Sequence, residues 1–283
     1  MNTERSIAIL VNPLSGKGKA KAIGQGLQDR LTALNIQGSL FANEWPDHFE
    51  GFTEIWIIGG DGTMNYFINR YKHIEIPLAL FKGGTGNDFA WKLYGNISVD
   101  EQFELVLNAE PKPVDAASCN DKLYINSLGI GFEGEVLDSM SSIRWMGGHL
   151  GYLWAVIRRI FSFKESRFII HADDNKTEGD FLLVNVNNAS RTGGGFMITP
   201  TALVNDGLID LLLCKPLSLI NRLRYLPLIE KGKHLQLPFI DHSLHKEVRI
   251  DCEKELFAHL DGELIRSQSF HIRILPRLFK FKY

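Results

Sequence analysis

Two glycine-rich segments, each directly after an apolar run, constrain the fold of this chain more than any other feature. The first reads WIIGGDGTMN at 56–65, and the second reads FKGGTGNDFA at 81–90. In both, a run of strand length ends on two glycines, and hydroxyl, amide and carboxylate side chains then open a predicted helix. A buried strand that leads through such a turn into a helix is typical of an α/β sheet, whose ligands bind beyond the carboxyl ends of the strands.

The first third of the chain alternates predicted strands and helices. We expect strands at 6–11, 37–42, 54–60 and 76–81, with helices at 19–34 and about 63–71. This alternation favours a parallel sheet covered on both faces. The glycine-rich or Asn-Pro segments at 12–18, 59–63 and 83–88 would then all follow strand ends, where phosphates commonly bind.

After Pro111 the pattern changes to strands with few helices between them. The predicted strands lie at 122–132, 166–173, 179–189, 195–202, 208–214, 246–252, 255–263 and 270–275, and the predicted helices near 148–162 and 218–231. Such a pattern indicates a mostly antiparallel second domain. A chain of 283 residues is long enough for two domains. Because no low-complexity linker separates them, we expect the domains to share a cleft.

Composition excludes several classes of function. The formal net charge is −2, so no global field would attract nucleic acid, and no nucleic-acid partner is expected. The three cysteines lie far apart and suit a reducing cytoplasm. The apolar stretch near the start is cut by Asn12 and Pro13, which favours a strand over a signal peptide. No window reaches the ~18 apolar residues of a spanning helix, so we predict a cytoplasmic protein that meets a membrane only peripherally.

The residues of the first loop suit a phosphate ligand. Gly59 and Gly60 permit a sharp turn with no Cβ, and the following helix offers unpaired N–H groups to an anion. Asp61 would repel phosphates unless a divalent cation lay between them, which indicates Mg²⁺–nucleotide chemistry. The alternative is a plain glycine-rich turn in which Asp61 caps the helix. A second such loop with Thr85, and a basic segment at 11–20 that is not a Walker A loop, favour the phosphate reading.

Taken in order and spacing, NPLSGKGKA, GGDGTMN and GGTGNDFA resemble the diacylglycerol kinase catalytic-domain family, and in particular its soluble bacterial lipid kinases. The resemblance continues at 124–136, 187–213 and 259–263, so it covers nearly the whole chain. It implies a phosphofructokinase-like or NAD-kinase-like α/β domain at 1–120, followed by a β-sandwich-like domain that binds the lipid and a metal at 121–275. It also implies a final strand, about 276–283, that returns to the first domain.

The resemblance also implies site residues. ATP should lie against the glycine-rich loops, lined by Gly59, Gly60, Asp61, Gly62, Thr63, Met64, Asn65 and Thr85. A Mg²⁺ site should lie in ALVNDGL, with a carboxylate from Asp206 and backbone carbonyls from Leu203 and Leu208. Hard oxygen ligands of this kind suit Mg²⁺. Relatives often have Asp-Asp-Gly here, whereas this chain has Asn205 before Asp206, so a role for position 205 is not carried over.

Phosphoryl transfer also needs an acceptor for the proton of the attacking hydroxyl. In the LDGE segment, Asp261 and Glu263 are the expected candidates for this general base. From sequence alone the same letters also fit a hairpin turn built on Asp-Gly. Asp61 is a third candidate, because some eukaryotic lipid kinases use the matching acid. The choice between these carboxylates stays open at this point.

A lipid substrate requires contact with a membrane surface. Residues 147–164 place apolar side chains at helical spacing beside Arg158, Arg159 and Lys164, as an interfacial helix would. A helix that covers a sheet of the second domain would show the same stripe. The expected partners are therefore a lipid at a membrane surface and, as a further option, a second copy of the chain in a homodimer.

Three functions compete. The first is an ATP-dependent lipid kinase that transfers the γ-phosphate to a hydroxyl of diacylglycerol or a related lipid. The second is an NAD kinase, which shares the Gly-Gly-Asp-Gly turn but fits GGTGNDFA less well. The third is a non-catalytic regulator of the same fold that senses a nucleotide or a lipid. The acids Asp61, Asp206, Asp261 and Glu263 favour the first.

Overall fold

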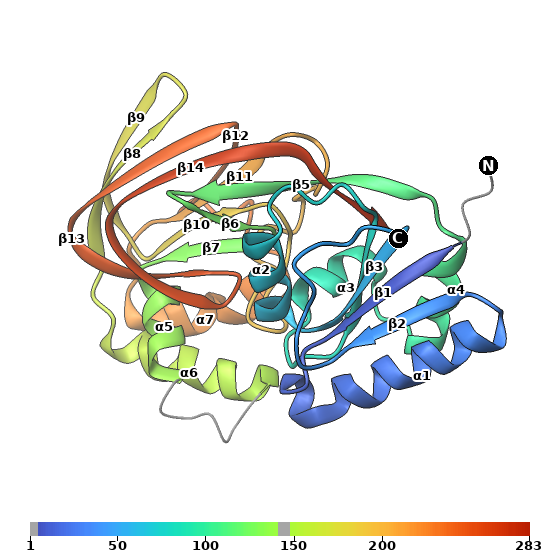
Figure 1. The fold of residues 1–283 in the computed structure, drawn as a ribbon. Helices are drawn as coiled ribbons and strands as arrows, with labels where there is room; N and C mark the ends of the chain where they lie inside the picture. The colour runs from blue at the N-terminus through green and yellow to red at the C-terminus, as the bar shows by residue number, and fades with distance from the viewer. Residues whose placement is uncertain (1–4, 141–147) are drawn as a thin grey trace. The chain divides into compact units, whose positions relative to one another are not determined.

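The four apolar runs of the first third are neighbouring parallel strands in the computed structural model, which describes residues 5–140 and 148–283 (Figure 1). They pair in the order β2-β1-β3-β4. Strands β1 and β3 are buried along their whole length, which is why they read as continuous apolar runs. The bounds are β1 (Ser6–Val11), β2 (Gln37–Phe41), β3 (Glu54–Gly59) and β4 (Leu78–Lys82).

One helix connects β1 to β2 and another connects β3 to β4, as predicted, whereas residues 42–53 form an irregular connection between β2 and β3. Two more helices follow β4, and the second of them was not foreseen. The bounds are η1 (Ser15–Gly18), α1 (Lys19–Ala33), α2 (Asp61–Arg70), α3 (Asp88–Tyr94) and α4 (Val99–Asn108). The unforeseen helix is α4, which begins with a capping box. The Ser98 hydroxyl accepts a bond from the Glu101 N–H, and the Glu101 carboxylate accepts one from the Ser98 N–H.

The chain divides into two compact units, one of residues 1–114 with 277–283 and one of residues 115–276. In the second unit, β12-β11-β10-β7-β13 pair antiparallel in that order, and β8 pairs with β13 and β9. The bounds are β5 (Pro111–Cys119), β6 (Lys122–Tyr124), β7 (Ser127–Ile130), β8 (Ser166–Ala172), β9 (Asn175–Phe181), β10 (Leu183–Asn187), β11 (Ile209–Cys214), β12 (Ile240–His245), β13 (Glu247–Leu260) and β14 (Glu263–Lys282).

Alternation along β10 and β11 separates two apolar cores within the second unit. Val184 and Leu211 belong to a core made by strands alone, which also includes residues of β8, β13 and β14. Leu183 and Leu212 point to the other face, into a core shared with three helices. These helices are α5 (Phe132–Met140), α6 (Gly148–Ser162) and α7 (Leu219–Glu230). None of the helices in the described ranges is long and apolar enough to cross a membrane.

Four predictions for the second unit were wrong. Residues 179–189 contain the end of β9 and the whole of β10 rather than one strand. Residues 122–132 form two short strands and the start of α5 rather than one strand. The strand predicted at 246–252 and most of the one predicted at 255–263 form a single strand, β13, which has an irregular register between Asp251 and Leu256 and ends at Leu260. Residues 195–202 form no strand: Phe196 and Ile198 are buried in the helix-side core, and the Thr199 hydroxyl donates to the Ala189 carbonyl (2.8 Å).

The longest strand, β14, joins the two units. It pairs antiparallel with β13 in the second unit. Near its end it pairs parallel with β4 in the first unit, where Phe281 lies opposite Leu78. The fold class is thereby confirmed: an α/β domain, a β-sandwich-like domain, and a C-terminal strand that returns to the first domain. Of the segment predicted to be interfacial, Gly147 lies outside the described residues.

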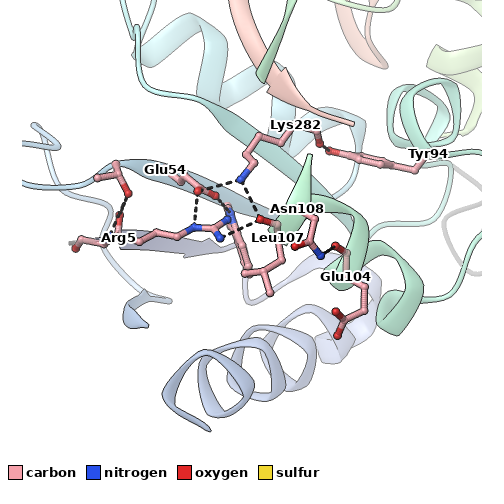
Figure 2. Close-up of polar contacts among 10 residues, drawn as sticks. Arg5, Glu54, Tyr94, Glu104, Leu107, Asn108 and Lys282 are labelled. Atoms are coloured by element: carbon pink, nitrogen blue, oxygen red, sulfur yellow. Dashed lines mark hydrogen bonds and ion pairs between the residues drawn. The ribbon is translucent and has the colours of Figure 1, made fainter. Parts of the chain in front are cut away.

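A buried ion cluster fixes the returning strand (Figure 2). The Glu54 carboxylate at the start of β3 accepts bonds from Arg5 Nε (2.6 Å), Trp56 Nε1 (2.9 Å) and Lys282 Nζ (3.1 Å). Arg5 also donates to the Leu107 carbonyl at the end of α4 (2.9 Å). Burial lowers the pKa of Lys282, and the nearby carboxylate offsets only part of that effect.

These contacts predict unequal effects of removing the two charges. Replacing Glu54 by Gln leaves Arg5 and Lys282 close together without a counter-ion, and should lower the free energy of unfolding by about 2 kcal/mol. Replacing Lys282 by Met removes a cation whose burial is costly and leaves Arg5 paired with Glu54, so the loss should be about 1 kcal/mol or less. Urea unfolding of both variants measures this, and a larger loss for Lys282→Met would contradict it.

Candidate active site

The three loops that follow β1, β3 and β4 touch one another through glycine backbones. A Cβ on Gly84 would lie 2.4 Å from the Cα of Gly60, and one on Gly16 would lie 2.4 Å from the Gly83 carbonyl oxygen. Gly16 also has a φ of +59°, which favours glycine. The loops after β3 and β4 are also joined by a hydrogen bond from the Gly83 N–H to the Gly59 carbonyl (2.8 Å). The glycines are therefore needed for loop-to-loop contact in the molecule itself.

The predicted nucleotide-binding residues lie together, but their side chains differ in exposure. Thr63, Met64 and Asn65 are buried in the first turns of α2. The Thr63 hydroxyl accepts a bond from Asn12 Nδ2 (2.9 Å) and is bonded to the Ser15 hydroxyl (3.1 Å), so it ties the GGDG loop to the loop that follows β1. Thr85 is exposed. Gly60, Asp61 and Gly62 are half-buried, so Thr85 is the one exposed residue of the predicted set.

Asp61 caps a helix, but not its own. Its Oδ2 accepts from the Asp88 N–H (3.1 Å) and its Oδ1 from the Phe89 N–H (3.0 Å), both in the first turn of α3. A carboxylate at this position satisfies two otherwise unpaired donors and interacts favourably with the helix dipole. Asp61 therefore fixes the GGTGND loop against the GGDG loop. Its contact with a cation stays a prediction.

The two carboxylates of the LDGE segment lie in different environments. Asp261 is in the turn between β13 and β14, is 3% exposed, and has a φ of +49°. Its carboxylate accepts bonds from the N–H groups of residues 125, 126 and 127 at 2.8, 2.9 and 2.9 Å. Glu263 is exposed at the start of β14. Asp261 thus anchors the turn between β6 and β7, whereas Glu263 presents its carboxylate to solvent.

The predicted metal-binding loop is held by two acids, Asp206 of the loop itself and Asp115 of β5. Asp206 Oδ1 accepts from the Leu208 N–H (3.1 Å), and the Gly207 N–H donates to Asp115 Oδ2 (2.7 Å). Partial burial raises the pKa of Asp206, and the neighbouring acids Asp210 and Asp115 raise it further. A cation would favour the ionised form, so the loop's carboxylate and carbonyl oxygens are a chemically suitable donor set for Mg²⁺.

Across residues 5–140 and 148–283, no group of three or more His, Cys, Asp or Glu side chains is arranged to bind a metal. The predicted set contains a single side chain, from Asp206, and two backbone carbonyls, so its use as a metal site stays a prediction.

Sequence reasoning missed Asp115. This residue is fully buried in β5, and its carboxylate holds the 203–208 loop by accepting a bond from the Gly207 N–H. Its carbonyl also accepts from Asn188 Nδ2 (3.0 Å), which donates to the Ile125 carbonyl as well (2.8 Å). A signal was present: Asp115 is an acid within the strand-like stretch VDAAS at 114–118.

Comparison with known proteins covers both units. Residues 6–119 match the model of the diacylglycerol kinase catalytic domain, and residues 126–281 match the YegS C-terminal NAD kinase beta sandwich-like domain. A relative in Shewanella frigidimarina named "Probable lipid kinase YegS-like" is 27% identical over 95% of this chain and 91% of its own length. A protein of Mycobacterium tuberculosis named "Diacylglycerol kinase" is 26% identical over 95% and 92%.

A solved structure of a candidate diacylglycerol kinase from Bacillus anthracis superimposes with a TM-score of 0.81 at 24% identity, covering 100% of this chain and 96% of that one. At this identity the similarity shows the fold. The two matched domains and the names of these relatives place this chain in the class of two-domain lipid kinases. The chain belongs to the diacylglycerol kinase catalytic-domain family.

Proposed function

We propose that this chain is an ATP-dependent lipid kinase that transfers the γ-phosphate of ATP to a hydroxyl of diacylglycerol or a related lipid. The observation that carries the proposal is the direct contact of the two glycine-rich loops through Gly60 and Gly84. Helix α2 begins at the first of these loops, so its first N–H groups lie at the end of β3, while Asp61 accepts the first N–H groups of α3 and holds the second loop beside them. Such an arrangement suits a run of phosphates.

The nucleotide would bind mainly to backbone. The N–H groups of Gly60 to Gly62 and the exposed Thr85 hydroxyl would contact the phosphates, while Thr63 keeps the first loop fixed through Asn12 and Ser15. Asp61 holds the start of α3 and with it the second loop. Pre-positioned donors of this kind are what phosphoryl transfer requires of a protein, because there is little covalent chemistry to perform.

Leu203, Asp206 and Leu208 would hold Mg²⁺ through one carboxylate and two carbonyl oxygens. When bound, Mg²⁺ supplies positive charge that offsets the charge of the phosphates. The buried Asp115 would keep the loop in place through its bond to the Gly207 N–H.

Glu263 would accept the proton of the attacking lipid hydroxyl. Its carboxylate is exposed, whereas the oxygens of Asp261 accept three backbone bonds and anchor a turn. A general base must reach the proton that it removes, and an exposed carboxylate can do so. Asp261 would then support the site by fixing residues 125–127.

Access to a lipid would come from peripheral contact with the cytoplasmic face of a membrane. One stripe of α6 is apolar yet exposed, at positions spaced as successive helical turns, namely Leu150, Trp154, Ile157 and Phe161. The Arg158 guanidinium lies 5.6 Å from the Trp154 ring. An exposed apolar stripe with adjacent basic groups is the pattern of a helix that lies in a membrane interface.

A transfer assay tests the proposal. Wild-type protein with radiolabelled ATP and Mg²⁺ should label a lipid in a panel of diacylglycerol, phosphatidylglycerol, ceramide and sphingoid base. Asp206→Asn should need about tenfold more Mg²⁺ for the same rate, because one charged ligand is lost. Labelled NADP without labelled lipid would instead identify an NAD kinase. Binding of ATP–Mg²⁺ with no labelled product would identify a non-catalytic regulator.

A further inference from the structure

Three side chains of the second unit form a continuous hydrogen-bonded chain in the order Ser243, His245, Asp173. The Ser243 Oγ lies 2.8 Å from His245 Nε2, and His245 Nδ1 lies 2.7 Å from Asp173 Oδ2. None of the three belongs to the predicted nucleotide-binding, metal-binding or proton-accepting residues. A hydroxyl, an imidazole and a carboxylate in this order are the groups that activate the nucleophile in serine hydrolases.

Two separate elements bring these residues together. Ser243 and His245 are two positions apart on β12, so their side chains lie on the same face of the sheet. This face carries the core made by strands alone, because Leu211 and Ile209 of that core lie directly opposite them on β11. Asp173 belongs to the two-residue turn between β8 and β9, where its φ is +51°. The hydrogen-bonded chain therefore links this turn to the end of β12.

The contact with Asp173 determines which nitrogen of the His245 ring carries the hydrogen. An ionised carboxylate only accepts hydrogen bonds, so the hydrogen between the two groups is on Nδ1. In the neutral ring Nε2 then has a lone pair, and it accepts the hydroxyl hydrogen of Ser243. The His245 side chain is 10% exposed, which limits the directions in which the ring can turn. His245 is thus held as a base directed at the Ser243 oxygen.

The edge of the sheet supplies a backbone donor beside Ser243. Within the described ranges, β12 pairs with β11 alone. The Lys215 N–H donates to the Phe239 carbonyl (2.9 Å), and bonded pairs alternate with non-bonded pairs along an antiparallel ladder. Positions 241, 243 and 245 therefore bond to β11, and the Leu244 N–H points away from it. The N–H of the residue after a serine nucleophile is a common donor to the oxyanion of acyl transfer.

We propose that Ser243, His245 and Asp173 form a second active site, which hydrolyses small carboxylic esters through an acyl-serine intermediate. The Ser243 oxygen attacks the ester carbonyl carbon while His245 Nε2 takes its proton. The bond from that carbon to the alcohol oxygen then breaks, and the departing alcohol receives the proton. Water attacks the acyl group and gives a proton to Nε2, which returns it to Ser243 as the carboxylic acid leaves. Water is the only co-reactant.

Exposure defines the substrate class. Ser243 is half-buried, and the neighbouring Leu244 side chain is 47% exposed. The nucleophile is therefore near the protein surface, beside an apolar side chain that a short acyl group can contact. Asp173 would touch no reacting atom, so it is a positioning residue, whereas Ser243 and His245 are the catalytic residues.

Labelling with a fluorophosphonate probe tests the nucleophile, because an activated serine oxygen displaces fluoride and forms a bond to phosphorus. Wild-type protein should carry the label on Ser243, located by peptide mass spectrometry, and Ser243→Ala should lose it. Ser118→Ala is the matched control: Ser118 is a half-buried serine of β5 whose hydroxyl bonds to the Arg273 carbonyl (3.5 Å). This variant should keep the wild-type labelling. A folded wild-type protein in which Ser243 stays unlabelled would overturn the proposal.

Hydrolysis of p-nitrophenyl acetate tests the other two residues. His245→Gln should lower kcat about 100-fold, because the base is lost. Asp173→Asn should lower kcat about 100-fold at unchanged KM and melting temperature, since an amide can donate to Nδ1 and so favours the wrong tautomer. Asp173→Glu should restore part of that loss. Full kcat in Asp173→Asn or in His245→Gln would overturn the proposal, and the chain of contacts would then serve only to hold β12 to the turn.

Discussion

Replacing Asp61 by Ala is expected to lower kcat/KM for lipid phosphorylation by about 100-fold, because the start of α3 and the GGTGND loop lose their anchor. Asp61 accepts both the Asp88 and the Phe89 N–H bonds, and both donors would be left unpaired. The free energy of unfolding should fall by about 2 kcal/mol at the same time, as for loss of a strong helix cap. Steady-state kinetics and urea unfolding measure the two effects.

Two further variants make the Asp61 experiment specific. Asp61→Asn retains one acceptor oxygen and should keep about half of the lost stability. Asp47→Ala removes an acid of the same unit that is exposed and paired with Arg70, and should change neither quantity measurably. If Asp61→Ala lost activity at full stability, its role would be that of a metal ligand alone and the anchoring role would be wrong.

The second large effect is expected at Asp261. Asp261→Ala leaves three buried N–H groups of residues 125–127 without an acceptor, and should lower the free energy of unfolding by about 4 kcal/mol. Glu263→Gln, two residues away, changes an exposed side chain and should stay within about 0.5 kcal/mol of wild type. Urea unfolding of the two variants, side by side, measures the difference.

The same pair separates the anchor from the base. Glu263→Gln should lower kcat by about 100-fold or more, the usual effect of losing a general base, without a change in stability. Full activity of Glu263→Gln would refute the assignment of the proton acceptor. A stable, folded Asp261→Ala protein would show that the turn between β6 and β7 does not depend on this carboxylate.

Motif and pattern predicted much of the first unit. The apolar runs that became β1 and β3 are buried on both faces, and their short length and flanking Pro or Gly residues distinguish them from buried helices. The hydrogen-bond partners of Asp61 could not be predicted, because they are the backbone N–H groups of Asp88 and Phe89. Every residue except proline has such a group, so the residue types at 88 and 89 give no sign of the contact. A capping acid is easily assigned to its own helix, whereas here tertiary contact assigns it to the next one.

The second unit was harder to predict, because the alternation of apolar and polar residues does not match the strands that form there. Phe196 and Ile198 alternate as in a strand, but they enter the helix-side core from an irregular loop. The helix α5 begins two residues after the short strand β7 ends. Glycines at 129, 131 and 134 lie on both sides of this boundary, so the sequence does not indicate where the strand ends and the helix begins. Asn185 of β10 reads as an ordinary strand residue, yet its buried amide finds no hydrogen-bond partner among the described residues, which is visible only in three dimensions.

The returning strand β14 has a consequence for how the chain reaches its native state. The first unit is discontinuous, because residues 1–114 require residues 277–283, and the whole second unit lies between them in the sequence. During synthesis, the Glu54 carboxylate can therefore pair with Arg5 early, but it cannot pair with Lys282 until the last residues of the chain have been made. The first unit, completed so late, can assume its final form only after the second unit has been synthesised, which couples the folding of the two units.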